Sequence, residues 1–306
     1  ASLFVNPELS GGAGLSDAYG VASSTNGETF RVGGHDPKIY LARLFFKQLF
    51  ACDASTSYVA SDFNQLAGRM PTRYFALTVG KVDISDFFDN NTYSHDPRTQ
   101  FLAWGFKDFG AWDYPANTRG YTPSIVLEYV TPTYELRYGA SLVPEEANGN
   151  DMDWNISKAS AHSLEYTQRF SFKGRPGAVR VLGYFNTAHM GDYEQSLALN
   201  PTAPDVTATR KYGNSKYGFG VNFEQELSKY MGVFGRVSWS DGHHETWTFT
   251  EIDRSISAGI SLDGSLWKRS GDNMGVAYVT SGLSQPHRAY LKVGGNGFML
   301  GDGNLN

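Results

Sequence analysis

The sequence predicts an all-β protein: an antiparallel transmembrane β-barrel, of which about twelve strands can be read. Segments with alternating apolar and polar residues recur along the chain, and many exceed the roughly 5–6 residues usual in globular sheets. Transmembrane strands need about 9–11 residues to cross the hydrocarbon, which these segments satisfy. Short connections also alternate with long ones, which is typical of outer-membrane barrels.

The segment 123–142 shows both the pattern and the ambiguity that it carries. Apolar side chains occupy one parity on each side of a short turn, and charged side chains occupy the other. The apolar set is Ile125, Leu127, Tyr129, Tyr134, Leu136 and Tyr138, and the charged set is Glu128, Glu135 and Arg137. A soluble sandwich would turn the apolar face inward, whereas a membrane barrel would turn it toward lipid. Parity alone leaves both open, and the alternation of connection lengths favours the barrel.

Composition excludes several classes of function. The 306-residue chain has a formal net charge of −5 and no basic run, so we expect no nucleic-acid partner. No stretch approaches the roughly 18 consecutive apolar residues of a spanning helix. Cys52 is the single cysteine, so neither an intrachain disulfide nor a cysteine metal cage is possible. His243 and His244 are adjacent, and adjacent side chains of a strand point to opposite faces, so we predict no metal site. We also predict no cofactor and no enzymatic activity.

The expected strands follow in chain order. They lie near 2–8, 37–50, 72–82, 122–130, 133–143, 158–173, 177–189, 211–227, 230–241, 248–263, 272–282 and 289–299. Short connections are expected at 131–133, 173–177, 228–230 and 263–273, and long ones at 144–157, 190–210 and around 240–247.

The connection 83–120 is too long for a structureless loop in a compact fold. It carries a helix signal of its own, with Ser94 or Asp96 as the cap, Pro97 in the first turn and apolar residues at 101, 102 and 104. We expect this aromatic segment to pack inside the lumen.

Strand parity assigns the wall of the barrel. The lipid-facing set includes Tyr40, Ala42, Leu44, Phe46, Leu164, Tyr166, Phe170, Phe172, Val181, Phe185, Tyr217, Phe219, Val237 and Trp239. The same parity turns Arg43, Lys47, Glu165, Arg169 and Arg180 toward the lumen. An arginine that faces lipid at the membrane midplane costs about 2–4 kcal/mol, so this parity should hold near the membrane centre.

Six stretches resemble the carbohydrate-selective porin family of Gram-negative bacteria (OprB-type). They are "NGETFRVGG" (26–34), "KIYLARLFFKQ" (38–48), "LTVGK" (77–81), "YSHDPRTQFLAWG" (93–105), "GAWDYPANTRGYT" (110–122) and "GFMLGDGNLN" (297–306). The resemblance extends over nearly the whole chain, and 77–122 is its specific part. The family's fold is a sixteen-stranded outer-membrane barrel that passes sugars by diffusion. The resemblance therefore implies one barrel domain over 1–306, with strands missing at both ends.

The resemblance also implies the function. It predicts a bacterial outer-membrane porin for passive, carbohydrate-selective diffusion of monosaccharides or short oligosaccharides into the periplasm. Its partners would be sugars as permeating solutes and outer-membrane lipid, and a monomer and a homo-trimer are both open.

The segment 83–120 resembles the inward-folded loop that narrows porin channels. From it we predict Asp86, Asp89, Trp104 and Trp112 as sugar-contacting residues, opposite the wall residues Arg31, Arg43, Lys47, Glu165, Arg169 and Arg180. Arginine and carboxylate groups hydrogen-bond hydroxyls in pairs, and aromatic rings stack on the C–H faces of sugars. Each aspartate taken singly is better explained as a turn cap or a structural ion pair. The set as a whole favours a constriction.

Two alternative functions, from other classes of protein, are also considered against the sequence. A secreted β-rich glycoside hydrolase or lectin-like domain would need a polar outward face. The hydrolase would also need two carboxylates roughly 5–10 Å apart in a cleft. A general cation porin is compatible with the net charge of −5, but not with the family-like segments.

Overall fold

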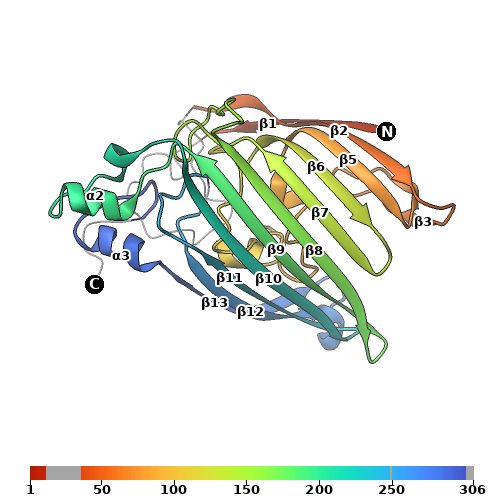
Figure 1. Ribbon diagram of the computed structural model, residues 1–306. Coiled ribbons are helices and arrows are strands. Elements are labelled where there is room, and N and C mark those ends of the chain that lie inside the picture. Colours follow the sequence, from red (N-terminus) through yellow and green to blue (C-terminus); the bar gives the residue numbers. More distant parts are fainter. Residues whose placement is uncertain (12–35, 249, 301–306) are drawn as a thin grey trace.

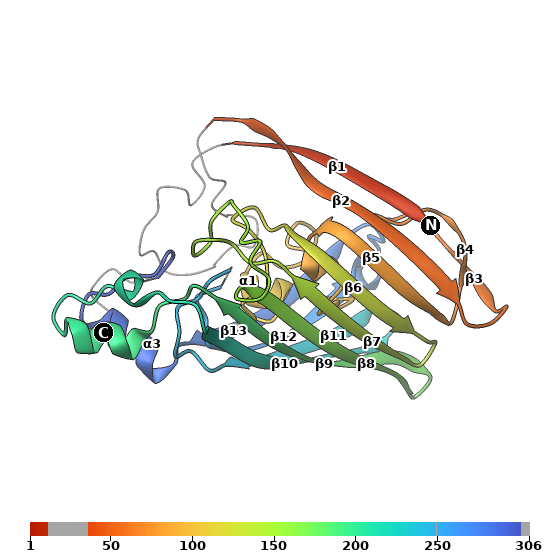
Figure 2. The ribbon, with the colours of Figure 1, turned by 45° about the horizontal axis from the view of Figure 1, so that its top comes forward.

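The fold is known from a computed structural model, which describes residues 1–11, 36–248 and 250–300. Within these residues, eleven strands form one antiparallel sheet in the order β1-β2-β5-β6-β7-β8-β9-β10-β11-β12-β13. The sheet curves around the loop that joins β5 to β6 (Figures 1 and 2). Its strands are β1 (Ser2–Ser10), β2 (Lys38–Ala51), β5 (Tyr74–Val82), β6 (Thr122–Val130), β7 (Tyr134–Ser141), β8 (Ser160–Phe172), β9 (Arg175–Ala188), β10 (Asn214–Ser228), β11 (Met231–Ser240), β12 (Arg254–Asp263) and β13 (Asn273–Gly282).

Short and long connections gather at opposite ends of the sheet (Figure 1). The long end carries two helices, α2 (Tyr193–Leu199) and α3 (Gln285–Lys292), and the 3-10 turn η2 (Val206–Thr209). The other end carries the tight turns, the 3-10 turn η3 (Gly264–Trp267) and a hairpin of β3 (Thr56–Val59) and β4 (Gly68–Pro71). The predicted alternation of connection lengths is therefore confirmed from β5 to β13, whereas the connection 52–73 between β2 and β5 is a long one at the short-turn end.

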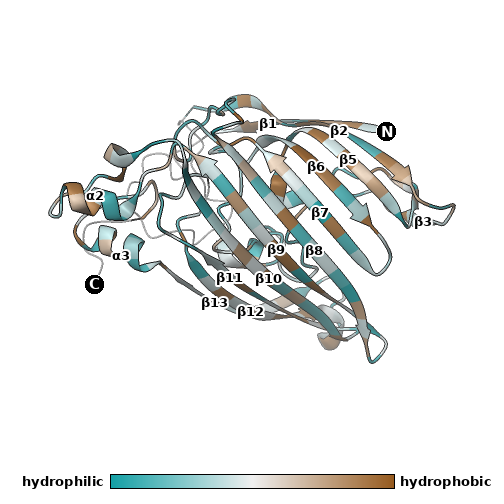
Figure 3. Ribbon diagram, in the orientation of Figure 1, coloured by the Kyte–Doolittle hydropathy of each residue, from teal (hydrophilic) through white to brown (hydrophobic). Residues whose placement is uncertain are grey.

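The predicted parity is confirmed along β8 to β11. On β8, Leu164 is 51% exposed on the convex face, whereas the next residue, Glu165, is 1% exposed on the concave face. Colouring by hydropathy shows apolar and polar residues alternating along these strands (Figure 3). An apolar convex face and a charged concave face are the reverse of a soluble sandwich and match a membrane barrel.

One parity assignment on β2 is wrong. The register shifts between Asn6 and Pro7, so that Asn6 pairs with Arg43 and Pro7 pairs with Leu41. Ala42 is the extra residue of a β-bulge, which flips the parity of the residues before it. Pro7 cannot donate a ladder hydrogen bond, which suits this irregular position. Tyr40 therefore faces inward and Ala42 is buried. Both residues were predicted to face lipid, and neither does.

Three other sequence predictions need correction. The strand expected at 289–299 is instead α3 and the turn that follows, because Ser284 caps a helix with a proline in its first turn. The strand expected from 248 begins only at Arg254. The helix expected to begin at Ser94 or Asp96 and to include residues 101–104 does not form. The Asp96 carboxylate accepts from the Arg98 amide in a local turn, and the helix of this loop is the single turn α1 (Trp104–Lys107).

The β5–β6 loop fills the concave side of the sheet with aromatic side chains. Phe88, Trp104, Phe109, Trp112 and Tyr114 belong to one buried cluster, together with residues of the wall. Two glycines of the wall make this approach possible. A Cβ atom on Gly220 would lie 2.4 Å from the Phe109 ring, and one on Gly232 would lie 2.1 Å from the Tyr93 ring. The loop therefore lies inside the curved sheet, as expected.

Candidate functional site

The loop meets the wall at an arginine–aspartate pair. Arg43, in the middle of β2, donates from Nε to Asp86 Oδ2 at 2.7 Å and from Nη2 to Asp86 Oδ1 at 2.9 Å. Asp86 ends the 3-10 turn η1 (Ile84–Asp86), which Asp83 caps by accepting from the Ser85 amide at 3.0 Å. Arg43 Nη2 also lies 3.6 Å from Asp83. A planar guanidinium that holds a carboxylate with two bonds fixes the geometry of both groups.

Aromatic rings flank this pair. The Arg43 guanidinium carbon lies 4.9 Å from the ring centre of Tyr121 and 4.8 Å from that of Phe63, within the range of cation–π contacts. Tyr121 donates its hydroxyl to Glu8 at 2.7 Å, and Tyr40 donates to the same carboxylate at 2.6 Å. We call Arg43, Asp86, Tyr121, Phe63, Tyr40 and Glu8 the β2 site. It combines hydrogen-bonding charges with flat apolar faces.

The charge of the β2 site responds to pH near neutrality. Burial raises the pKa of Asp86 to about 6, and repulsion from Asp83 adds to that shift, while Arg43 opposes it. Protonation of Asp86 would leave Arg43 with a weaker partner, so the net charge of the site becomes more positive on acidification.

A ladder of opposite charges continues along the wall. Glu128, Arg137 and Glu165 are direct partners on three adjacent strands. Arg137 lies 3.3 Å from Glu128 and 3.8 Å from Glu165, and Lys47 lies 2.8 Å from Glu128. Opposite charges across neighbouring strands stabilise the sheet. Two predicted wall residues, Lys47 and Glu165, therefore belong to one ladder.

The other predicted wall residues lie apart from the β2 site. Arg180 pairs with Glu224 at 3.2 Å on the far part of the wall. Arg169 pairs with Glu135 near the short-turn end and is 44% exposed. Arg31 lies outside the described residues. The structure thus unites Arg43 with Asp86. It also joins Arg169 to the ladder of Lys47 and Glu165, because Glu135 contacts both Arg169 and Arg137. Arg180 lies apart from both groups.

Asp89, predicted as a sugar contact, is a fully buried anchor of the loop. Its carboxylate accepts from Arg236 Nε at 3.0–3.1 Å and also from Asn222, both on the wall. Its own amide donates to Glu165 at 2.7 Å. Asp89 has a φ of 55°, an uncommon conformation that aspartate tolerates better than most residues. Arg236 further donates to the Phe106 carbonyl at 2.8 Å, so one arginine fastens two parts of the loop.

Trp104 and Trp112 are buried inside the loop. Trp104 stacks on Tyr114 with ring centres 5.5 Å apart, and Trp112 meets Phe88 edge-on. Their exposed fractions are only 3% and 1%, so neither offers a face to a solute in this arrangement. The rings beside the charged pair are instead Tyr121 and Phe63. Tyr121 directly precedes β6, but nothing in the local pattern of 52–73 places Phe63 at the wall.

The chain is similar to known porins in sequence pattern and in fold. Residues 1–299 match the model of the OprB family, described as carbohydrate-selective porins. A search of curated proteins gave no match. Among solved structures, the high-pH structure of Pseudomonas putida OprB is similar, with a TM-score of 0.61 and 17% sequence identity.

That alignment covers 87% of this chain and 59% of the other, so the chain spans less than two thirds of its structural relative. No helix among the described residues is long and apolar enough to cross a membrane. Porins of this family lie in the outer membrane, which agrees with the apolar convex face. Since the family match covers residues 1–299 of 306, the chain belongs to the OprB family of carbohydrate-selective outer-membrane porins.

Proposed function

We propose that this protein is a porin through which monosaccharides or short oligosaccharides diffuse passively across the outer membrane, past the β2 site. Family membership supports the class of solute. The single observation that carries the proposal is the Arg43–Asp86 pair, which joins the wall to the folded loop beside the Tyr121 ring.

The chemistry of the β2 site suits a neutral, hydroxyl-rich solute. Guanidinium and carboxylate groups hydrogen-bond adjacent hydroxyls, and the rings accept the C–H face of a pyranose. The side chains of Asp86 and Glu8 keep 24% and 38% of their surface exposed, so they stay accessible to a solute. Weak contacts spread over several groups are what conduction requires, because tight binding would slow release. The charge ladder of Lys47, Glu128 and Arg137 would supply further contacts.

The soluble alternative fits the structure less well. A lectin-like domain or secreted hydrolase would turn a polar face to water, yet large apolar side chains cover the convex face. Ile39 and Val276 are 79% and 70% exposed there. Such a surface is expected to lie against lipid acyl chains.

Liposome swelling tests this function. Full-length protein in liposomes should admit glucose and short oligosaccharides, and glucose should enter faster than a charged amino acid of similar mass. Swelling that follows solute size alone would leave a pore without carbohydrate selectivity. Absence of swelling with every solute would reject the porin function.

A further inference from the structure

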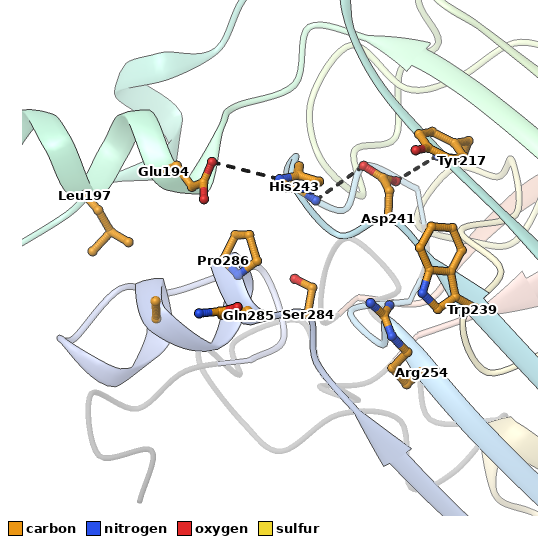
Figure 4. Close-up of a pocket in the computed structure, with 11 residues that line it drawn as sticks. Glu194, Leu197, Tyr217, Trp239, Asp241, His243, Arg254, Ser284, Gln285 and Pro286 are labelled. Atoms are coloured by element: carbon orange, nitrogen blue, oxygen red, sulfur yellow. Dashed lines mark hydrogen bonds and ion pairs between the residues drawn. The ribbon is translucent and has the colours of Figure 1, made fainter.

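A cavity of about 470 Å³ lies at the long-connection end of the sheet, outside the channel (Figure 4). One side is formed by the wall residues Tyr217, Trp239 and Arg254. The other is formed by α2 and α3, with Leu197 and Pro286 lining the cavity. The cavity belongs to no part of the β2 site.

The wall side of this cavity is the lipid-facing side. Tyr217 is 49% exposed on the convex face, whereas its neighbour Lys216 is fully buried on the concave face. The Trp239 ring packs on Phe219 and Tyr217 with ring centres 5.8 and 5.9 Å apart, and so extends one aromatic strip. β11 ends one residue after Trp239. Aromatic girdles of outer-membrane barrels lie at this depth, where the hydrocarbon meets the headgroups.

Arg254 places a positive charge beside this strip. It is the register partner of Trp239, and its guanidinium carbon lies 5.0 Å from the Trp239 ring centre. Ser255 faces the loop inside the sheet, so parity turns Arg254 outward. Its Nη1 donates to the backbone carbonyl oxygens of Ser240 and Asp253. In the described part of the chain, no carboxylate lies within ion-pair distance of Arg254.

The acidic residues of the cavity already have partners. The Asp241 carboxylate accepts from the amides of Tyr217 at 3.0 Å and His243 at 3.4 Å. Glu194 lies 4.0 Å from the His243 ring at the outer rim, as Figure 4 shows. Among the described residues that line the cavity, Arg254 is therefore the only arginine or lysine, and no carboxylate lies within ion-pair distance of it.

We propose that this cavity holds the phosphate-bearing headgroup of an outer-leaflet lipid, with the phosphate on Arg254 and an acyl chain along Trp239 and Phe219. A guanidinium matches phosphate geometry with two parallel donors. A cation facing lipid is costly at the midplane but costs little near the interface. The long connections of such barrels are extracellular, which assigns the site to the outer leaflet. The inference does not depend on passage of sugars through the channel.

Native mass spectrometry of the full-length, delipidated protein tests the site. Phosphatidylglycerol and galactosyl diacylglycerol of matched chain length are titrated separately, because only the first carries a phosphate. We expect phosphatidylglycerol to bind about tenfold more tightly. Arg254→Gln should lower its affinity to that of the galactolipid, and Arg254→Lys should retain part of it.

Arg269→Gln is the matched control, since Arg269 is an exposed arginine in the connection between η3 and β13. It should bind phosphatidylglycerol as the unaltered protein does. Unchanged single-channel conductance of Arg254→Gln would show that the variant is folded. Equal binding of the two lipids by the unaltered protein would overturn the proposal, as would unchanged binding by a folded Arg254→Gln variant.

Discussion

Arg43 of the wall and Asp86 of the folded loop face one another through two hydrogen bonds, of 2.7 and 2.9 Å. The pair joins residues 43 positions apart and fixes the loop against β2 beside Tyr121. Arg43 is 6% exposed and fastens the loop, whereas the Asp86 side chain keeps 24% of its surface exposed. The pair is therefore a fastening whose carboxylate is also a candidate contact for solutes.

Arg43→Ala should weaken block of the channel by glucose about tenfold. A hydrogen bond to a charged group contributes about 1.5–3 kcal/mol. A tenfold change in the inhibition constant corresponds to about 1.4 kcal/mol of binding free energy. The inhibition constant of glucose for single-channel current measures this. Arg175→Ala is the control, because Arg175 pairs with Glu226 at the start of β9. Equal inhibition constants in the Arg43 variant and the unaltered protein would remove Arg43 from the site.

Acidification should shift the ion selectivity of the channel. Burial raises the pKa of Asp86 to about 6, so this carboxyl gains its proton as pH falls from 7 to 5. The ratio of cation to anion permeability, obtained from reversal potentials, should fall over that range. Asp86→Asn should abolish the step and resemble the unaltered channel at pH 5. A flat profile in the unaltered protein would contradict this assignment.

Loss of the Arg236–Asp89 contact should release the loop. Arg236→Gln leaves the Asp89 carboxylate buried without its charge partner, which costs about 3–5 kcal/mol. Hydrogen exchange in 89–107 should become faster, and the double variant Asp89→Asn/Arg236→Gln should recover part of the protection. Arg269→Gln, which alters an exposed pair, should leave exchange unchanged. Unaltered exchange in Arg236→Gln would show that the aromatic cluster alone holds the loop.

Glu251 should make the segment at Met299 and Leu300 sensitive to alkaline pH. Burial raises the pKa of Glu251 to about 8, while its carboxyl accepts from the amides of Met299 at 2.5 Å and Leu300 at 2.6 Å. The unfolded pKa is about 4.3. The folded state thus binds the proton more tightly, and its stability falls as pH rises from about 4 to 8.

Hydrogen exchange at these two amides, corrected for intrinsic rates, should accelerate as pH rises from about 5 to about 8 and level off above it. Glu251→Gln mimics the protonated group and should remove the acceleration. Glu146→Gln, at an exposed loop position, should retain it. The same acceleration in Glu251→Gln would assign the effect to another group.

The sequence predicted the wall well because lipid and lumen impose opposite polarity on alternate residues. Leu164 and Glu165 follow this rule, as do Val237 and Arg236. The rule failed at Tyr40, where the bulge opposite Pro7 shifts the parity by one residue. A bulge of this kind leaves no mark in the pattern of its own strand.

The site was only partly predictable. Arg43 and Asp86 could be named because one is an inward-facing wall charge and the other lies in the family-like loop. Their flanking ring, Phe63, is brought in by tertiary packing of the 52–73 connection, which carries no periodic signal. The Arg236–Asp89 contact spans 147 positions, and no local pattern indicates such a partner. Trp104 and Trp112 were named for their chemistry, but packing between loop and wall decides their burial.

Single-channel recording of the full-length protein in a planar bilayer, with glucose titrated into the salt, tests the central claim most directly. We expect open channels whose current falls saturably with glucose. Current that changes with glucose only as viscosity requires would contradict a carbohydrate site in the channel. A protein that forms no channels and stays soluble without detergent would contradict the porin function itself.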